Sequence, residues 1–237
     1  MKYQRVLLKL SGEALSGEKG HGFEERVCIE VAEQIKKLAD KGCQVSVVIG
    51  GGNFWRGRSS ENIQRNKADQ IGMLATVMNA IYMSEICRAV GLKTAILTPF
   101  EVGSFTKSFS RDRVEKYFSK GMVVFFAGGT GHPFFSTDTA TALRAVEIEA
   151  DVILAAKSID GVYSADPNVD PHAKKYDELS MAQIIDDKLG VIDLAAAVLC
   201  YENHMPMWVF ALQGKDSILQ CVEGNCTGTY LSVDERK

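Results

Sequence analysis

The strongest constraint on the fold is a series of short apolar runs separated by segments with helical spacing. These runs are rich in Val, Ile and Leu and show little polar–apolar alternation: Arg5–Leu10, Gln44–Ile49, Lys93–Thr98, Met122–Phe126, Asp151–Ala156, Met207–Ala211 and Thr229–Leu231. Runs of this kind are typical of strands that are covered on both faces. The pattern therefore predicts an α/β protein, a three-layer αβα sandwich around a mainly parallel central sheet.

Helical segments lie between these runs. In Glu25–Lys41 the apolar residues recur at helical spacing, and Gly42 ends the segment. Further helices are expected at Ala68–Ala89, Asp112–Lys120, Thr137–Glu149, Leu179–Lys188 and Asp193–Glu202. The helix Ala68–Ala89 is apolar on more than one face, which indicates burial in the core or in a subunit interface. Because no repeat or linker interrupts the pattern, we expect one domain over residues 1–237, with a frayed tail at 234–237.

Composition argues against several classes of protein. The chain has 237 residues and a net charge of −3, so no global basic field favours nucleic acid. No apolar stretch approaches the roughly 20 residues that span a bilayer, and the first residues lack the apolar core of a signal peptide. We therefore expect a cytoplasmic protein with neither a membrane nor a nucleic-acid partner. The four histidines offer no metal-ligand spacing.

The six cysteines follow no Cys-x-x-Cys pattern. We expect them to be reduced and mostly buried, as small apolar residues. Cys221 and Cys226 are close enough in sequence to form a disulfide, which is the less favoured alternative.

Glycine turns follow three of the predicted strands. They are Lys9-Leu10-Ser11-Gly12, Gly50-Gly51-Gly52-Asn53 and Gly128-Gly129-Thr130-Gly131. The chain has no Gly-x4-Gly-Lys-Ser/Thr motif, and Trp55 stands where a dinucleotide-binding turn needs its last glycine. Each glycine taken alone is more often an ordinary turn residue. Because ligands collect at the carboxyl ends of strands in open α/β sheets, three such turns predict a phosphate site.

The segment Val123–Asp138 carries the most chemical information. An apolar run ends in a glycine-rich turn, and hydroxyl residues then begin a helix. Glycine permits close approach of backbone to a ligand, and the N–H groups at a helix start favour anions. Phe134 and Phe135 could wall a flat ring beside that anion. The segment therefore predicts a nucleotide site.

Four further positions have two readings each. Lys9 interrupts an apolar strand, so it either extends to solvent at an edge or meets an anion. Arg56 closely follows the triple glycine and is either a surface charge or a phosphate ligand. Asp151 opens an apolar strand as a linker acid or as a carboxylate that orients Lys9. Tyr163, near Asp166, either packs in a loop or stacks on a purine.

Together these segments resemble the amino acid kinase superfamily and, within it, the bacterial uridylate kinases. The resemblance covers essentially the whole chain. The early lysine, the triple glycine and Asp160-Gly161-Val162-Tyr163 are general to the superfamily. Two longer motifs resemble uridylate kinases in particular: Gly72-Met73-Leu74-Ala75-Thr76-Val77-Met78-Asn79 and Gly129-Thr130-Gly131-His132-Pro133-Phe134-Phe135-Ser136-Thr137-Asp138. The resemblance implies ATP-dependent phosphorylation of UMP to UDP in de novo pyrimidine nucleotide (CTP) biosynthesis.

The resemblance also implies roles for individual residues. Lys9, Arg56 and Asp151 would be catalytic, with Asp151 orienting Lys9. ATP would contact Lys9, Leu10, Ser11, Gly12, Gly52, Arg56, Lys157, Tyr163 and Asp166. Of these, Lys157, Tyr163 and Asp166 would lie at the adenine end. UMP would contact Gly51, Asp69, Thr130, Gly131, His132, Pro133, Phe134, Phe135, Ser136 and Thr137, with Asp69 on the ribose.

The implied assembly is a homohexamer. Mg²⁺ would enter with ATP, held mainly by phosphate oxygens and water, so no protein metal ligand is expected. The segment Gly17–Gly22 matches a loop associated with GTP activation in some members, so GTP and UTP are candidate effectors.

The chain departs from the pattern at His132, where relatives usually have asparagine, at Ala156–Ile159 and at Phe54-Trp55. Residues 61–66 align poorly with the family. Two alternatives remain open: a kinase for acetylglutamate, glutamate or carbamate, and a non-catalytic nucleotide sensor or oxyanion storage protein.

Overall fold

The computed structural model describes residues 1–55, 62–165, 167, 169–214 and 216–233. Within them, a central sheet has nine strands in the order β4-β3-β5-β2-β1-β6-β10-β11-β9. Its pairings are parallel except for β10 with β11. The bounds are β1 Arg5–Leu10, β2 Gln44–Ile49, β3 Lys93–Thr98, β4 Lys107–Ser108, β5 Met122–Phe126, β6 Val152–Lys157, β9 Glu178–Ser180, β10 Met207–Ala211 and β11 Thr229–Ser232. The predicted mainly parallel sheet is confirmed.

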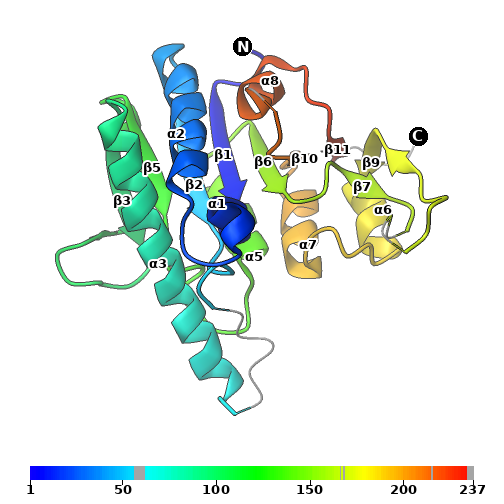
Figure 1. Ribbon diagram of the computed structural model, residues 1–237, viewed down its shortest axis with the longest axis horizontal. Coiled ribbons are helices and arrows are strands. Elements are labelled where there is room, and N and C mark those ends of the chain that lie inside the picture. Colours follow the sequence, from blue (N-terminus) through cyan, green and yellow to red (C-terminus); the bar gives the residue numbers. More distant parts are fainter. Residues whose placement is uncertain (56–61, 166, 168, 215, 234–237) are drawn as a thin grey trace.

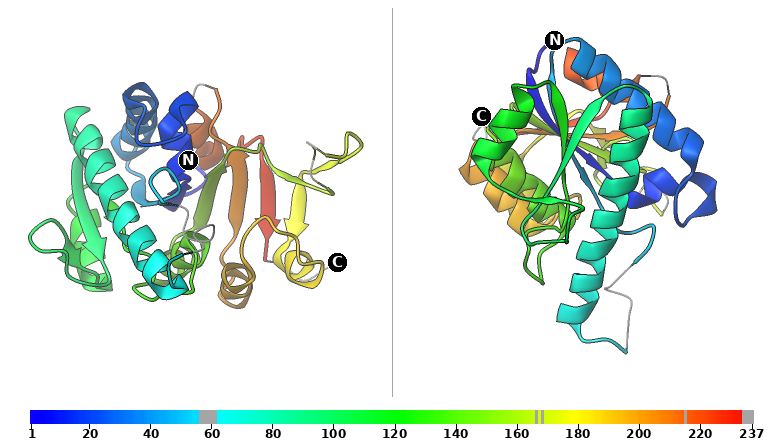
Figure 2. Two further views of the ribbon diagram at one scale, coloured as in Figure 1. Left: turned by 60° about the horizontal axis from the view of Figure 1, so that its bottom comes forward. Right: turned by 90° about the vertical axis from the view of Figure 1, so that its left-hand side faces the viewer.

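Helices cover both faces of this sheet and make the three predicted layers (Figures 1 and 2). One core packs α2 (Glu25–Asp40), α3 (Arg65–Ala89) and α8 (Ser217–Glu223) on one face. The other core packs α4 (Arg111–Phe118), α5 (Thr137–Glu147), α6 (Met181–Asp186) and α7 (Leu194–Glu202) on the opposite face. The short elements α1 (Gly12–Ser16) and η1 (Gly17–Lys19) follow β1. The amino-terminal part of α3 projects beyond the sheet (Figure 1).

The side chains of β1 alternate between the two cores. Val6, Leu8 and Leu10 pack with α2 and α3, whereas Leu7 packs with α5 and α7. Successive residues of a strand point to opposite faces. Lys9 therefore belongs to the α5 face, at the carboxyl end of the strand.

A separate two-stranded sheet, β7 (Val162–Tyr163) with β8 (Lys175–Tyr176), lies beside the main sheet. The backbone N–H of Val162 donates to Thr229 Oγ1 at 2.8 Å. Lys175 Nζ donates to the carbonyl of Thr227 at 2.7 Å and to Asp160 at 2.9 Å. These bonds fasten the hairpin to the start of β11.

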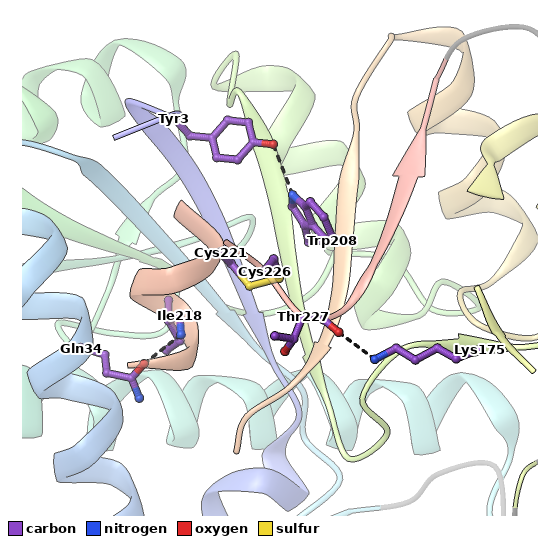
Figure 3. The surroundings of a disulfide bond; sticks show 8 residues. All are labelled: Tyr3, Gln34, Lys175, Trp208, Ile218, Cys221, Cys226 and Thr227. Atoms are coloured by element: carbon purple, nitrogen blue, oxygen red, sulfur yellow. Dashed lines mark hydrogen bonds between the residues drawn. A yellow bond between two sulfur atoms is a disulfide. The ribbon is translucent and has the colours of Figure 1, made fainter. Parts of the chain in front are cut away.

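The expectation of six free thiols is wrong for one pair. Cys221 and Cys226 form a disulfide between α8 and the segment that leads into β11, as Figure 3 shows. The other four cysteines are free and buried. Burial raises the pKa of the Cys28 thiol to about 11 and that of Cys43, Cys87 and Cys200 to about 12, so these thiols stay protonated.

No helix in the described part of the chain is long and apolar enough to cross a bilayer. The tail 234–237, expected to fray, lies outside the described residues.

Candidate functional site

The three glycine turns meet at one edge of the sheet, as predicted. β1 pairs in parallel with β2 and β6, and β2 with β5, so their carboxyl ends share that edge. A cavity of about 560 Å³ opens there. Residues of all three turns line it: Ser11, Gly12, Gly50, Gly51, Gly52 and Gly129. Its size is in the usual range of a small-molecule site.

The turns can approach so closely because glycine occupies two critical positions. A Cβ on Gly12 would lie 2.4 Å from the carbonyl oxygen of Gly50. A Cβ on Gly51 would lie 2.9 Å from the carbonyl oxygen of Gly72 in α3. Any side chain at either position would therefore push the backbone apart at the floor of the cavity.

The sheet register brings two lysines into this cavity. Lys9 pairs with Ala155 of β6, and Lys157 follows two residues later, so both side chains emerge on the α5 face. Both line the cavity. Their side chains are 12% and 20% exposed, so both ammonium groups are largely removed from water.

Asp138 lies between the two lysines, in the first turn of α5. Its Oδ1 is 3.0 Å from Lys9 Nζ, and its Oδ2 is 3.7 Å from Lys157 Nζ. Ser136 is the N-cap of α5, and its Oγ accepts from the backbone N–H of Asp138 and of Thr139. The cap thus fixes the helix start that presents the carboxylate.

The electrostatics of this trio follow from burial and proximity. Burial alone would raise the pKa of Asp138, but the neighbouring Lys9 and Lys157 outweigh it and hold that pKa below its ordinary value. Burial lowers the pKa of Lys157, with Lys9 adding to this effect and Asp138 opposing it. Within the trio two cations share one anion, and this local excess of positive charge suits a phosphate group, whereas over the whole lining Lys9, Lys157 and Arg65 are balanced by Asp69, Asp138 and Asp193.

Asp193 connects the start of α5 with α7. It accepts from Ser136 Oγ, from Thr139 Oγ1 at 2.9 Å and from the backbone N–H of Ala196 at 3.0 Å. Lys157 Nζ also donates to the carbonyl of Val191, just before this helix. Residues 190–193 therefore form a wall of the cavity that is tied to both α5 and β6.

The opposite wall comes from α3. Asp69 Oδ2 accepts from the backbone N–H of Phe134 at 2.8 Å and is 2.9 Å from Arg65 Nε. Thr76 Oγ1 accepts from the backbone N–H of Gly128 at 2.8 Å. The helix α3 therefore holds the third glycine turn at its first residue, Gly128, and holds the chain just after the turn at Phe134.

Asp151 does not orient Lys9, and that prediction is wrong. Its Oδ2 accepts from the backbone N–H groups of Gln4 and Arg5, at 2.6 and 2.8 Å. These groups lie at the amino end of β1, the edge opposite the cavity. The parallel pairing of β1 with β6 puts the residue before β6 beside the start of β1, so Asp151 is a structural linker acid.

Several other predicted residues do line the cavity. In addition to the turn residues already named, they are Asp69, Phe135, Ser136, Thr137 and Lys157. The side chain of Leu10 instead lies in the core, fully buried, and its carbonyl accepts from Gly50 N. Besides Leu10, five predicted UMP residues and one further predicted ATP residue do not line the cavity: Thr130, Gly131, His132, Pro133, Phe134 and Tyr163. Arg56 and Asp166 lie outside the described residues.

Among the charged and hydroxyl side chains of the cavity, sequence reasoning missed Arg65, Thr76, Asp138 and Asp193. A usable signal existed for Asp138, because an acid two residues after a serine cap lies in the first turn of its helix. Asp193 has a similar signal as the N-cap of α7, but its place beside the cavity depends on the packing of α7 on α5, which the sequence does not show.

Among the described residues no cluster of three His, Cys, Asp or Glu side chains could hold a metal ion. The cavity carboxylates already have partners: Asp69 pairs with Arg65, Asp138 with the two lysines, and Asp193 with hydroxyl and backbone groups. This donor set fits Mg²⁺ that arrives on a nucleotide and keeps phosphate and water as its ligands.

Comparison with known proteins supports one family. The model of the amino acid kinase family matches residues 4–211. The chain belongs to the amino acid kinase family. A solved UMP kinase from Bacillus anthracis is 33% identical, with a TM-score of 0.94 over 99% of this chain and 98% of that one.

Two further solved structures agree with this placement. A UMP kinase from Ureaplasma parvum is 33% identical, with a TM-score of 0.92 over 98% of this chain and 100% of that one. A uridylate kinase from Archaeoglobus fulgidus is 31% identical, with a TM-score of 0.72 over 96% and 99%. The amino acid kinase resemblance read from the sequence is therefore confirmed.

Proposed function

We propose that this protein is a uridylate kinase, which transfers the γ-phosphoryl group of ATP to UMP. The observation that carries the proposal is the Lys9–Asp138–Lys157 trio at the meeting point of three glycine turns. The UMP kinases of Bacillus anthracis and Ureaplasma parvum, similar over nearly their whole length, support the choice of UMP.

In the proposed reaction a phosphate oxygen of UMP attacks the γ-phosphorus of ATP. The bond to the β,γ-bridging oxygen breaks, and UDP and ADP leave, so no covalent protein nucleophile is required. The chain's task is alignment and charge neutralisation. Lys9 and Lys157 would face the equatorial oxygens, while the N–H groups of the glycine turns would hold the flanking phosphates. Bound Mg²⁺ would supply further neutralisation of phosphate charge.

Asp138 would hold both ammonium groups in place before the nucleotides bind. Lys157, first expected at the adenine end, is therefore assigned to the phosphates as well. Asp69 would receive the ribose of UMP, and Phe135 would border its base. Arg56 keeps its predicted role as a phosphate ligand. We further propose a cytoplasmic enzyme of pyrimidine nucleotide synthesis that responds to GTP or UTP.

The decisive experiment incubates the enzyme with Mg-ATP and a mixture of UMP, CMP, dTMP and AMP, and identifies the products by mass spectrometry. We expect UDP as the main product. Parallel coupled assays with N-acetylglutamate, glutamate and carbamate test the other kinase class. Phosphorylation of one of these acids in place of UMP, or tight UMP binding without turnover, would contradict the proposal.

The catalytic assignment has its own test in Lys9→Ala. Removing one well-placed cation typically lowers the rate by about 10²–10³-fold, so we expect a folded enzyme with a loss of turnover of that size. Lys36→Ala is the matched control, because Lys36 pairs with Asp40 on the exposed face of α2. Near-normal turnover in Lys9→Ala would refute the assignment.

A further inference from the structure

Two buried asparagines lie directly beneath the phosphate-binding turns. Asn53 is 3% exposed and Asn79, in the middle of α3, is 0% exposed. Each amide donates to the other: Asn53 Nδ2 to Asn79 Oδ1 at 3.0 Å, and Asn79 Nδ2 to Asn53 Oδ1 at 2.8 Å. A reciprocal pair of this kind fixes the orientation of both amides, because each nitrogen and each oxygen has its partner.

The remaining bonds of the pair go to backbone at the floor of the cavity. Asn79 Nδ2 also donates to the carbonyl of Gly50 at 2.7 Å. Asn53 Nδ2 donates to the carbonyl of Gly22 at 2.8 Å, and Gly22 N donates to the Asn53 carbonyl at 3.1 Å. The pair thus connects three separate segments, namely α3, the triple-glycine turn and the loop after η1.

The geometry around Gly12 shows how close this support lies to the reacting groups. A Cβ on Gly12 would be 2.4 Å from both Asn53 Oδ1 and the Gly50 carbonyl. Gly12 and Gly50 both line the cavity. A shift of either amide would therefore change the distance between the first and second glycine turns.

Asn79 also lies on the face of α3 that builds the site. Residues 69, 72, 76 and 79 follow one face of a helix, and the first three line the cavity. Asp69 and Thr76 hold the third glycine turn, whereas Asn79 holds the second. One helix face therefore sets the relative position of two turns that approach the same ligand.

We propose that Asn79, acting through Asn53 and the Gly50 carbonyl, is a positioning residue for phosphoryl transfer. It touches no substrate; it fixes the backbone N–H groups of residues 50–52 relative to Gly12 and Lys9. This inference rests on the proposed function, since it assigns those N–H groups to the transferring phosphates.

The test uses two variants in the full-length enzyme. Asn79→Asp keeps the shape but replaces the amide nitrogen by an oxygen that repels the Gly50 carbonyl. Asn79→Ser replaces the amide donor by a shorter hydroxyl without adding charge. Ser84→Ala is the matched control, because Ser84 is also buried on α3 but bonds to Thr94 Oγ1 at the start of β3.

Because a misplacement of about 1 Å can cost on the order of 10²-fold in rate, we expect kcat with UMP and Mg-ATP to fall about 10–100-fold in both Asn79 variants. KM for UMP should change less than about threefold, since the base and ribose contacts lie elsewhere. Ser84→Ala should keep the wild-type kcat. Hydrogen exchange of the amides at 50–53 should accelerate in the Asn79 variants only.

The proposal is overturned if folded Asn79→Asp and Asn79→Ser keep kcat within about twofold of wild type. It is also overturned if neither variant folds, because Asn79 would then serve stability alone, or if Ser84→Ala loses as much kcat. A wild-type enzyme that forms no UDP would refute the proposed function instead. In that case unchanged exchange at 50–53 would still overturn the positioning role, and faster exchange would support it.

Discussion

Asp138 determines the charge balance of the cavity because both lysine ammonium groups share its carboxylate. The two ion pairs, at 3.0 and 3.7 Å, are largely buried. Removing one partner of such a group leaves the others desolvated and uncompensated. The carboxylate therefore keeps two cations in place that would otherwise repel each other.

Asp138→Asn should lower the free energy of unfolding at pH 7 by about 3–5 kcal/mol, the cost of leaving buried charges without their partner. The folded-state pKa of Asp138 is lowered by Lys9 and Lys157 despite burial. Its contribution is therefore fully present above the unfolded pKa of about 3.9 and is lost as pH falls through the folded value. The stability difference between wild type and variant should thus begin to narrow below about pH 4 and should disappear only below the lowered folded-state pKa.

Urea unfolding at several values between pH 7 and pH 3 measures this difference. The control is Asp112→Asn, because Asp112 is exposed in the first turn of α4. A stability difference that is independent of pH would show that Asp138 acts through packing and not through its charge.

At the scale of elements, the long strands were predictable and the short ones were not. The covered strands β1, β2, β3 and β5 match their predicted bounds, because an apolar run buried on both faces is a local signal. The two-residue strands β4, β7 and β8 exist only through pairing with distant segments. Leu179, predicted to begin a helix, lies in β9, and Ser180 then caps α6.

In the candidate site, too, some features were predictable from the sequence and others were not. The glycine turns were predictable because the carboxyl ends of parallel strands share one edge. The partner of Lys9 was not predictable. Asp138 lies at the start of a helix and Asp151 lies just before a strand, and only the direction of the strands shows which of them is near Lys9. Asp151 lies at the amino edge beside Gln4 and Arg5, whereas Asp138 lies at the carboxyl edge.

The Cys221–Cys226 disulfide supports the element that holds the β7–β8 hairpin. It joins α8 to the segment whose Thr227 carbonyl binds Lys175 (Figure 3). A crosslink that closes so short a loop contributes about 2 kcal/mol through the entropy of the unfolded chain. In oxidising buffer, Cys226→Ser should therefore have a free energy of unfolding lower than that of wild type by about that amount. Wild type in dithiothreitol, which also lacks the disulfide, is the control.

Urea unfolding with and without dithiothreitol separates the two causes. The difference between wild type and Cys226→Ser should disappear once the reductant is present, because both chains then have free thiols. Hydrogen exchange at Val162, whose N–H is held by Thr229 Oγ1 at 2.8 Å, reports whether the hairpin loosens as well. A difference that persists in reductant would assign the effect to the lost sulfur packing.

At the scale of the whole molecule, α3 has two functions on opposite faces. One face carries Asp69, Thr76 and Asn79 toward the cavity. The other presents four apolar side chains to solvent, each 38–51% exposed: Ile71, Leu74, Met78 and Ile81. The helix also projects beyond the sheet (Figures 1 and 2). A contiguous exposed apolar face on a projecting helix is typical of a subunit interface, so we propose that this face of α3 packs against another copy of the chain, as the homohexamer implied by the sequence resemblance requires.

The double variant Leu74→Glu/Met78→Glu tests this interface by placing two charges at the centre of the apolar face. Burying an unpaired carboxylate is strongly unfavourable, so we expect the assembly to separate into smaller species. Size-exclusion chromatography with light scattering should give a multiple of the 26.0 kDa chain for wild type and a lower multiple for the variant. Val169→Glu is the control, because Val169 is 80% exposed in the loop between β7 and β8. A wild-type mass of 26.0 kDa would refute the interface, since the apolar face would then remain in water.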